Sequence, residues 1–557
     1  MSEEWQREKM VPFWKIWANP IVRRYARSRL RPVSLGGVLL VFVLIAAFIF
    51  FSIRQGAMGQ GQLELMDAAR LPIVPLLVLQ GLILFMLGTG QVAGAMTAEA
   101  DEGVLEYQRL APMTPLTKVV GYLFGLPIRE WVIFAATMPF SIFSMWQGKV
   151  PLGVFLEIYS VFIVAGVLYH LTGLLAGTVM KNRRWAFLGS MGLVFMLYTV
   201  LPQVAKFGLV YFKYFTILPV VEESFAYFVP RSGQMVIQTM QELVPTARFF
   251  GLNFPQVVFT LISQGILILA MSTMLWRRWR RNESHLLGKV GAVGLFAWVQ
   301  LVILGNALPL IETGQLFPSR EFGRRFGRFA GVDPANWQPE AWEIFMMIGI
   351  FGVVTLAMIW MMSFLIIPNE EGQVRGWRRV RKKGGSRLSI LSDPATATPW
   401  VFLMVAIGSV GWFTFAKAIV GSRWFPEFQL SSMALLAIVM VLFTGGILVQ
   451  TILETKGRKF TILAIILGGV LPLMLGMIAA LTKDELLPAG VWLIGISPMS
   501  WAMYASQVVV PIDDMPADVI RGIPLAFWFW QGVAVLLSLW MLNLLRRTRK
   551  EIAEKTK

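Results

Sequence analysis

Apolar residues recur along the chain in runs of about 20, the length that an α-helix needs to cross the hydrocarbon core of a bilayer. Short polar or charged segments separate these runs. The pattern predicts an all-α, polytopic membrane protein with about twelve transmembrane helices, at residues 34–53, 71–95, 119–145, 151–179, 186–204, 255–276, 291–311, 343–367, 400–420, 429–453, 461–481 and 522–545.

Composition supports the same class. Of the 557 residues, 56% are hydrophobic and 15% are charged, which excludes a soluble enzyme of this size. The chain has no cysteine and two histidines, His170 and His285. Cysteine-ligated zinc is therefore excluded, and we expect no metal site and no cofactor on this chain.

The distribution of charge predicts the orientation. The net charge of +18 could indicate nucleic acid in a soluble protein, but in a membrane protein it reflects topology first, and no nucleic-acid partner is expected. Loops on the side of the N-terminus hold 34 of the 50 basic residues against 14 acids. Because basic loops stay in the cytoplasm, both termini are predicted to be cytoplasmic.

Spacing indicates an internal duplication. Arg277 and Arg278 precede Arg546 and Arg547 by 269 residues, and the same offset separates Glu102-Gly103 from Glu371-Gly372. Six spans per half predict two parallel repeats about an axis along the membrane normal. The expected organisation is a cytoplasmic amphipathic segment at 1–33, a first half at 34–281 and a second half at 282–557 with a basic cytoplasmic loop at 368–399.

The first cytoplasmic loop, residues 98–115, is acidic, with four acids among its first ten residues. Val104, Tyr107 and Ala111 follow helical spacing, so we expect a short amphipathic helix with these residues on one face, ended by two prolines. Anionic lipid would repel such a loop, and its charge therefore favours a protein partner.

Two of these acids stand four residues apart, at Glu102 and Glu106. If they share one helix, their like charges repel each other and destabilise the helix by roughly a few tenths of a kcal/mol. A basic group that meets them would remove this effect, which again favours a partner.

This loop resembles the coupling-helix signature of ABC type-2 transporter permeases, an acidic pair, Gly-Thr, Leu-Glu and then Pro-Leu-Ser, with Val104 in place of the threonine. Residues 19–27 resemble the connector helix before the family's first span, and residues 496–500 resemble a proline-containing outside segment before its last span. The resemblance implies that the loop docks on an ATPase subunit through Glu102, Gly103, Leu105, Glu106, Leu110 and Pro112.

The family's activity implies further partners. The chain has no G-x-x-x-x-G-K-[ST] phosphate loop, so it is not expected to be an enzyme, and ATP and Mg would bind to separate ABC ATPase subunits, two of them. The resemblance implies an exporter in a bacterial inner membrane, in contact with membrane lipids, with a route lined by spans one, two and five and their counterparts. Lipid, drug, peptide and polysaccharide all remain open as the exported substrate.

The corresponding loop of the second half keeps the acidic pair and glycine, at Glu370, Glu371 and Gly372, which are the second-half coupling candidates. It then continues into seven basic residues by Arg387, without the Leu-Glu or proline elements. Such a stretch fits anionic headgroups, an ordinary cytoplasmic anchor or a differently charged ATPase face. We expect the two halves to be functionally unequal.

The ionisable candidates within the predicted spans are Arg129, Glu130, Glu157 and His170. Such residues are candidates for a pathway or gate, although each also has an interfacial or packing interpretation. Arg129 and Glu130 are adjacent and point about 100° apart on a helix, which suggests that they do not pair.

The alternative class is a twelve-span, ion-coupled secondary transporter. It would need several buried acids and a basic loop between spans two and three, whereas that loop is acidic here. A membrane-embedded transferase or hydrolase would need a cluster of histidine, acid or serine residues outside the spans, and the longest outside segments, 205–254 and 482–521, contain no histidine.

Overall fold

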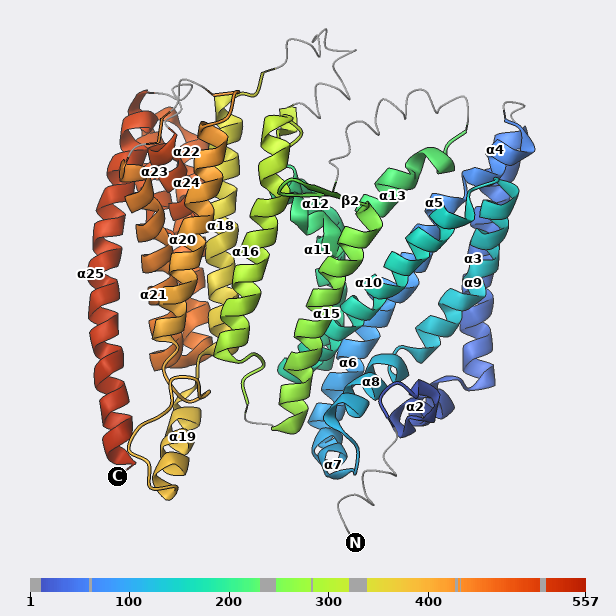
Figure 1. Ribbon diagram of the computed structural model, residues 1–557, viewed down its shortest axis with the longest axis horizontal. Coiled ribbons are helices and arrows are strands. Elements are labelled where there is room, and N and C mark those ends of the chain that lie inside the picture. Colours follow the sequence, from blue (N-terminus) through green and yellow to red (C-terminus); the bar gives the residue numbers. More distant parts are fainter. Residues whose placement is uncertain are drawn as a thin grey trace. The chain divides into compact units, whose positions relative to one another are not determined.

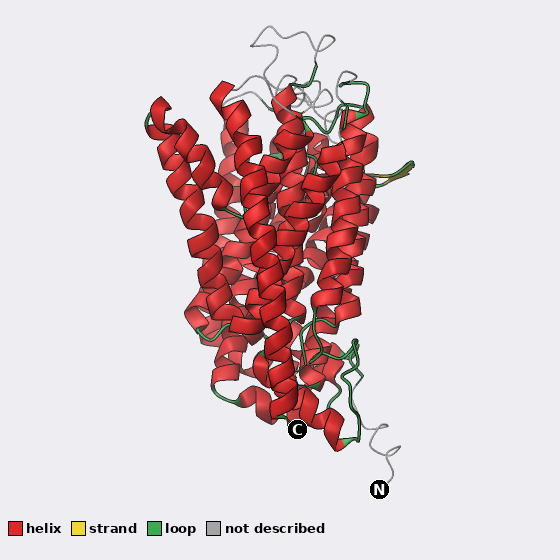
Figure 2. Ribbon diagram, turned by 90° about the vertical axis from the view of Figure 1, so that its left-hand side faces the viewer, coloured by secondary structure: helices red, strands yellow, loops and turns green. Residues whose placement is uncertain are grey.

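The computed structural model describes residues 12–59, 63–230, 247–281, 284–319, 338–425, 429–430, 432–510 and 517–556. Parts of the N-terminal segment 1–33 and of the outside segments 205–254 and 482–521 thus lie outside the described residues. The described chain is almost entirely helical, with one short two-stranded sheet, β1 (Ala247–Phe249) and β2 (Leu252–Phe254) (Figure 2).

Two compact units make up the chain. The first contains residues 1–203, 212–247 and 253–282, and the second contains residues 204–211, 248–252 and 283–557. Each unit has its own interior, and each is described by itself below. Two short segments of the first half of the sequence, 204–211 and 248–252, belong to the second unit.

The first unit carries six apolar helical runs and several short helices (Figure 1). The elements are η1 (Ile16–Ala18), α2 (Pro20–Arg29), α3 (Pro32–Gly59), α4 (Leu65–Arg70), α5 (Ile73–Gly81), η2 (Leu82–Leu87), α6 (Gly88–Asp101), α7 (Val104–Leu110), α8 (Pro115–Gly125), α9 (Ile128–Gln147), α10 (Leu152–Val179), α11 (Arg183–Thr199), α12 (Leu201–Ala205), η3 (Val210–Phe215), α13 (Leu218–Ser224), η4 (Phe225–Phe228) and α15 (Gln256–Arg280).

Small residues allow α6 and α10 to pack closely. A Cβ atom on Gly173 would lie 2.7 Å from the carbonyl oxygen of Thr89, and one on Gly177 would lie 2.7 Å from that of Ala93. Membrane helices associate through such small-residue contacts because lipid supplies no hydrophobic drive between them. The α6–α10 pair is therefore the fixed centre on which α11 and α15 pack.

A sharp bend separates α8 from α9, whose axes differ by 51°. Pro127 lies at the break, where it cannot donate the backbone hydrogen bond that a continuous helix requires. The predicted span at 119–145 is thus broken, and its first part, α8, turns to pack against α2.

The second unit also consists of long apolar helices with short ones between them (Figure 1). They are α16 (Lys289–Glu312), α18 (Ala341–Ile366), α19 (Glu370–Lys382), α20 (Thr398–Val420), α21 (Ser432–Ile465), η7 (Ile466–Val470), α22 (Leu471–Thr482), η8 (Asp484–Leu486), α23 (Leu487–Ile496), α24 (Trp501–Val509) and α25 (Ala517–Lys555). In its interior, Phe351 stacks on Phe415 with ring centroids 4.6 Å apart, and Trp412 donates to the Ile348 carbonyl over 2.8 Å.

The described residues contain ten helices that are long and apolar enough to cross a membrane, or up to eleven if α8 and α9 form one span. Each of the twelve predicted ranges overlaps one of these helices. With α8 and α9 taken as one span, the structure has eleven candidates for twelve predicted ranges, because the single helical run 432–482 overlaps two of the ranges. Gly457 interrupts that run with φ 79° and ψ 176°, at the basic turn that the sequence places between the two ranges.

Candidate docking site for a partner protein

Helix α7 forms the centre of the acidic loop and is separated from its neighbours on both sides. Gly103 follows α6 with φ 72°, in the left-handed region that glycine enters without a Cβ penalty. After Leu110, Ala111 is extended, and Thr114 then caps α8 by accepting from the backbone N–H of Thr117. Two breaks therefore allow α7 to point independently of α6 and α8.

The expected short helix is present, but Ala111 lies beyond its end, and the residue that it buries is not one of the expected face. Leu105 is the buried residue of α7, with 9% of its surface exposed, whereas Tyr107 is 80% exposed and Leu110 is 83% exposed. In a helix of only seven residues with apolar side chains on several sides, the sequence pattern does not show which side packs. The direction that the chain takes at Gly103 decides it. Large apolar side chains consequently face away from the unit.

The expected repulsion between Glu102 and Glu106 does not arise within one helix, because Gly103 separates them. Glu106 instead forms an ion pair with Arg109, three residues on. Two acids and two large apolar side chains are exposed here, and we define them as the docking surface: Glu102, Glu106, Tyr107 and Leu110.

Glu99, in the last turn of α6, ties this region to α2. Its carboxylate accepts hydrogen bonds from the hydroxyls of Tyr122, over 2.5 Å, and Tyr25, and it pairs with Arg24. Burial, and then the negative charge of Glu99, raise the pKa of Tyr25 far above its ordinary value, so this hydroxyl remains a donor at neutral pH.

Two further contacts hold the loop and α2 to α8. The Lys118 ammonium group donates to the Arg109 carbonyl over 3.1 Å, which fixes the end of α7. The Asn19 amide donates to the Thr117 carbonyl over 2.8 Å, while its oxygen caps α2 by accepting from Ile21. The segment that resembles a connector helix is thus a capped helix that packs on α8.

The corresponding loop of the second half has a different structure. Glu370, Glu371 and Gly372 form the first turn of α19, which Asn369 caps by accepting from the Gly372 N–H over 3.0 Å. Gly372 therefore lies in a helix, whereas Gly103 breaks one, although both follow an acid at the same sequence offset. Glu371 pairs with Arg375 along the helix, with 3.4 Å between their charged atoms.

The suggestion that Arg129 and Glu130 do not pair is wrong. The guanidinium group of Arg129 donates twice to Glu130 Oε1, from Nε over 3.1 Å and from Nη2 over 2.8 Å. The two side chains leave the helix in different directions, but the arginine side chain is long enough to bend round to its neighbour. Glu130 is buried, and Arg129 is partly exposed.

The other two ionisable candidates differ in burial. Glu157 is exposed on the second turn of α10. His170 is fully buried, and its Nε2 donates to the Leu84 carbonyl over 2.9 Å. Leu84 lies in the π-helical turn η2, where the ordinary helical hydrogen bonds are shifted, so His170 has a packing role between α10 and η2.

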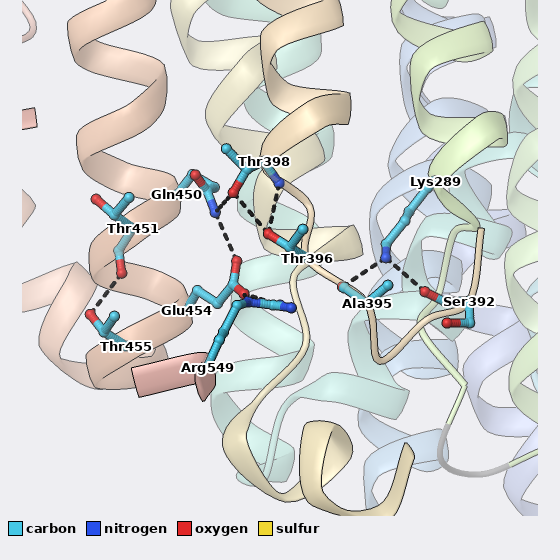
Figure 3. Close-up of polar contacts among 10 residues, drawn as sticks. All are labelled: Lys289, Ser392, Ala395, Thr396, Thr398, Gln450, Thr451, Glu454, Thr455 and Arg549. Atoms are coloured by element: carbon cyan, nitrogen blue, oxygen red, sulfur yellow. Dashed lines mark hydrogen bonds and ion pairs between the residues drawn. The ribbon is translucent and has the colours of Figure 1, made fainter. Parts of the chain in front are cut away.

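A polar network in the second unit includes residues that the sequence patterns did not indicate (Figure 3). Glu454, a fully buried side chain of α21, pairs with Arg549 of α25 and accepts from the Gln450 amide over 2.7 Å. The same amide of Gln450 donates to Thr398 over 3.0 Å. The network joins α20, α21 and α25.

Lys289, at the start of α16, is also almost completely buried. Its ammonium group donates to the carbonyls of Ser392 and Ala395, each over 2.7 Å, and so fixes the segment that leads into α20 (Figure 3). Lys289 and Glu454 both adjoin basic turns in the sequence, and hydropathy does not show which turn residues a neighbouring helix covers.

Within the described part of the chain, no group of three or more histidine, cysteine or acidic residues could hold a metal ion. The apolar helices define the class: this is a multi-pass helical membrane protein. Comparison of the chain with protein-family models, with curated proteins and with solved structures gives no match.

Proposed function

We propose that the protein is the membrane permease subunit of an ATP-driven ABC exporter and that its docking surface binds a separate ATPase subunit. The observation that carries this proposal is the geometry of α7, an isolated short helix that is anchored from behind and exposes Tyr107 and Leu110 beside Glu102 and Glu106. Exposed apolar side chains that lie together and are rimmed by polar residues mark contact sites for a protein or a membrane.

The helix pairings support duplicated halves within this proposal. In the first unit, α3 packs on α9, α6 on α10 and α10 on α15. The helices at the same places in the second unit pack alike, with α16 on α20, α18 on α21 and α21 on α25. Two repeats with cytoplasmic termini would place α7 and α19 on the same side of the membrane, one acidic and one basic.

The proposal can be tested through ATP hydrolysis, because the chain itself has no phosphate loop. The full chain, expressed in its native cells and purified in mild detergent, should carry vanadate-sensitive ATPase activity from its bound subunit. The double variant Tyr107→Ala/Leu110→Ala should lose at least about tenfold of this activity, as expected when apolar anchors leave an interface.

The matched control is Leu152→Ala/Leu156→Ala, which removes another exposed pair of large apolar side chains, 70% and 57% exposed, at the start of α10. This variant should retain the copurifying activity. Absence of ATP hydrolysis from the unmodified complex, or equal losses in the two double variants, would reject the ATPase-docking role of α7.

A further inference from the structure

Three arginines from different helices of the first unit gather near the end of α2. Arg29 is the last residue of α2, Arg129 lies in the first turn of α9, and Arg183 is the first residue of α11. α2 packs on α9, and Arg29 and Arg183 contact positions one turn apart on α6, at Gln91 and Gly94. Burial lowers the pKa of Arg29, the charge of Glu130 opposes this shift, and the charges of Arg129 and Arg183 lower the pKa further.

One carboxylate lies among these cations, and only one of its two oxygens accepts hydrogen bonds. Glu130 accepts both hydrogen bonds from Arg129 through Oε1, while its Oε2 is buried and has no hydrogen-bond partner among the described residues. The cluster thus has more positive than negative charge and one buried acceptor that lacks a donor. Buried polar atoms of this kind are usually satisfied, so the site is incomplete as it stands.

The surrounding side chains hold Arg29 in place. Its guanidinium group lies over the Tyr25 ring, 5.4 Å from the centroid, and the Gln91 amide, with its oxygen turned toward Arg29, accepts from Nη2 over 3.1 Å. The guanidinium group of Arg29, fixed in this way, can bind a phosphate through two parallel hydrogen bonds with little loss of entropy. Arg183 is exposed, and its aliphatic part packs along α6, where a Cβ on Gly94 would lie 3.7 Å from Arg183 Cγ.

Two apolar helix faces begin at this cluster. α3 starts at Pro32, three residues after Arg29, and α11 starts at Arg183 itself. Both helices expose large apolar side chains, among them Leu40 and Leu44 on α3, and Trp185, Leu188 and Phe195 on α11. Arginines at the ends of helices with exposed apolar faces could bind a molecule that has an anionic headgroup and apolar chains.

We propose that Arg29, Arg129, Arg183 and Glu130 bind the headgroup of an anionic glycerophospholipid, with the phosphate on the arginines and a headgroup hydroxyl donating to Glu130 Oε2. The acyl chains lie along α3 and α11. This lipid site goes beyond the proposed function, because binding needs no ATPase subunit and can be measured on the chain alone.

The test is a titration of the purified, delipidated full chain with phosphatidylglycerol, followed by native mass spectrometry. The unmodified chain should retain the lipid, and Arg29→Gln and Arg183→Gln should each weaken the tightest binding step by about tenfold, as expected for loss of a charge-assisted hydrogen bond. The controls Arg27→Gln and Arg184→Gln remove exposed arginines from the same helices and should change the affinity less than about twofold.

Two further probes identify the ligand. Phosphatidylcholine should bind more weakly than phosphatidylglycerol, and inorganic phosphate and glycerol 1-phosphate should not compete at millimolar concentration. Competition by these soluble phosphates would show that the site takes a free phosphate compound, which overturns the lipid assignment. Equal effects of the site variants and their controls would overturn the site itself. Neither result bears on ATPase docking.

Discussion

Glu99 and Glu454 illustrate how single carboxylates determine which helices stay together. Each lies near the end of a long helix and accepts hydrogen bonds or forms an ion pair with side chains from other helices. A buried carboxylate loses its hydration, so it is stable only when donors replace the lost water. Substitution of either residue therefore tests the attachment of a particular helix.

The first prediction concerns the attachment of α2. Glu99→Gln removes the charge that Arg24, Tyr25 and Tyr122 share, and we expect the local free energy of α2 detachment to fall by about 2 kcal/mol. Trypsin should then cleave at the exposed arginines of α2 about 30-fold faster, since cleavage of an opened segment follows its population. Asp101→Asn, an exposed acid two residues on, should leave the cleavage rate unchanged.

The second prediction concerns the buried pair of the second unit. Glu454→Gln and Arg549→Gln should each lower the free energy of unfolding by about 3–5 kcal/mol, because each leaves an uncompensated charge in the interior. The double variant should cost less than the sum of the two, measured by denaturant unfolding in detergent. Additive losses would show that the pair is not coupled, and Glu551→Gln, an exposed acid of α25, provides the control.

At the scale of elements, the backbone conformation of one glycine distinguishes the two loops that follow the second span of each half. Gly103 separates α6 from α7, and Gly372 lies within α19. The sequence shows an acid and a glycine in both places. Whether the helix breaks at the glycine depends on the residues before it, because Asn369 starts a new helix before Gly372 and no such cap precedes Gly103.

The third prediction tests this break. Gly103→Ala should cost about 1 kcal/mol, entirely from the left-handed backbone, since a Cβ there meets nothing within 4 Å. Gly153→Ala, in α10, also meets nothing within 4 Å but has ordinary helical geometry, and it should be neutral or slightly stabilising. If α7 docks an ATPase subunit, copurifying ATP hydrolysis should fall with the first variant alone.

The sequence predicts helix positions better than side-chain partners. Apolar runs mark the helices because every backbone polar group must be satisfied inside a bilayer, which leaves no alternative to a helix for each run. The burial of Leu105, the pairing of Arg129 with Glu130 and the bend at Pro127 depend on three-dimensional packing. Glu454 could have been suspected, since it is the acid in an otherwise basic turn.

At the scale of the molecule, the distribution of charge gives an orientation that the helices alone cannot provide. α2, α7 and α8 lie at one end of the first unit, and α19 lies beside the end of α25 in the second (Figure 1). The positive-inside rule predicts that both of these ends are cytoplasmic. The loop between α9 and α10 should then face outside.

The fourth prediction is that single cysteines introduced into this cysteine-free chain report opposite sides. Arg27→Cys and Lys382→Cys should react with an impermeant maleimide only after cells are opened, whereas Lys149→Cys should react in intact cells. All three positions are exposed, so differences in labelling reflect sidedness rather than burial. Labelling of Lys382→Cys from outside would reverse the orientation of the second unit.

Helix α25 has a mechanical consequence. Its 39 residues give it a length of about 58 Å, nearly twice the thickness of a bilayer core. Arg381 of α19 donates to the Ala553 carbonyl near its far end, and Glu454 grips it at Arg549. Pro524 lies within the helix, and the part that follows it, residues 525–555, is about 46 Å long. A tilt of that part by about 5° around its midpoint moves each of its ends by about 2 Å. A movement of α19 would thus tilt α25, and the opposite end of α25 would move in the opposite direction at the other membrane surface.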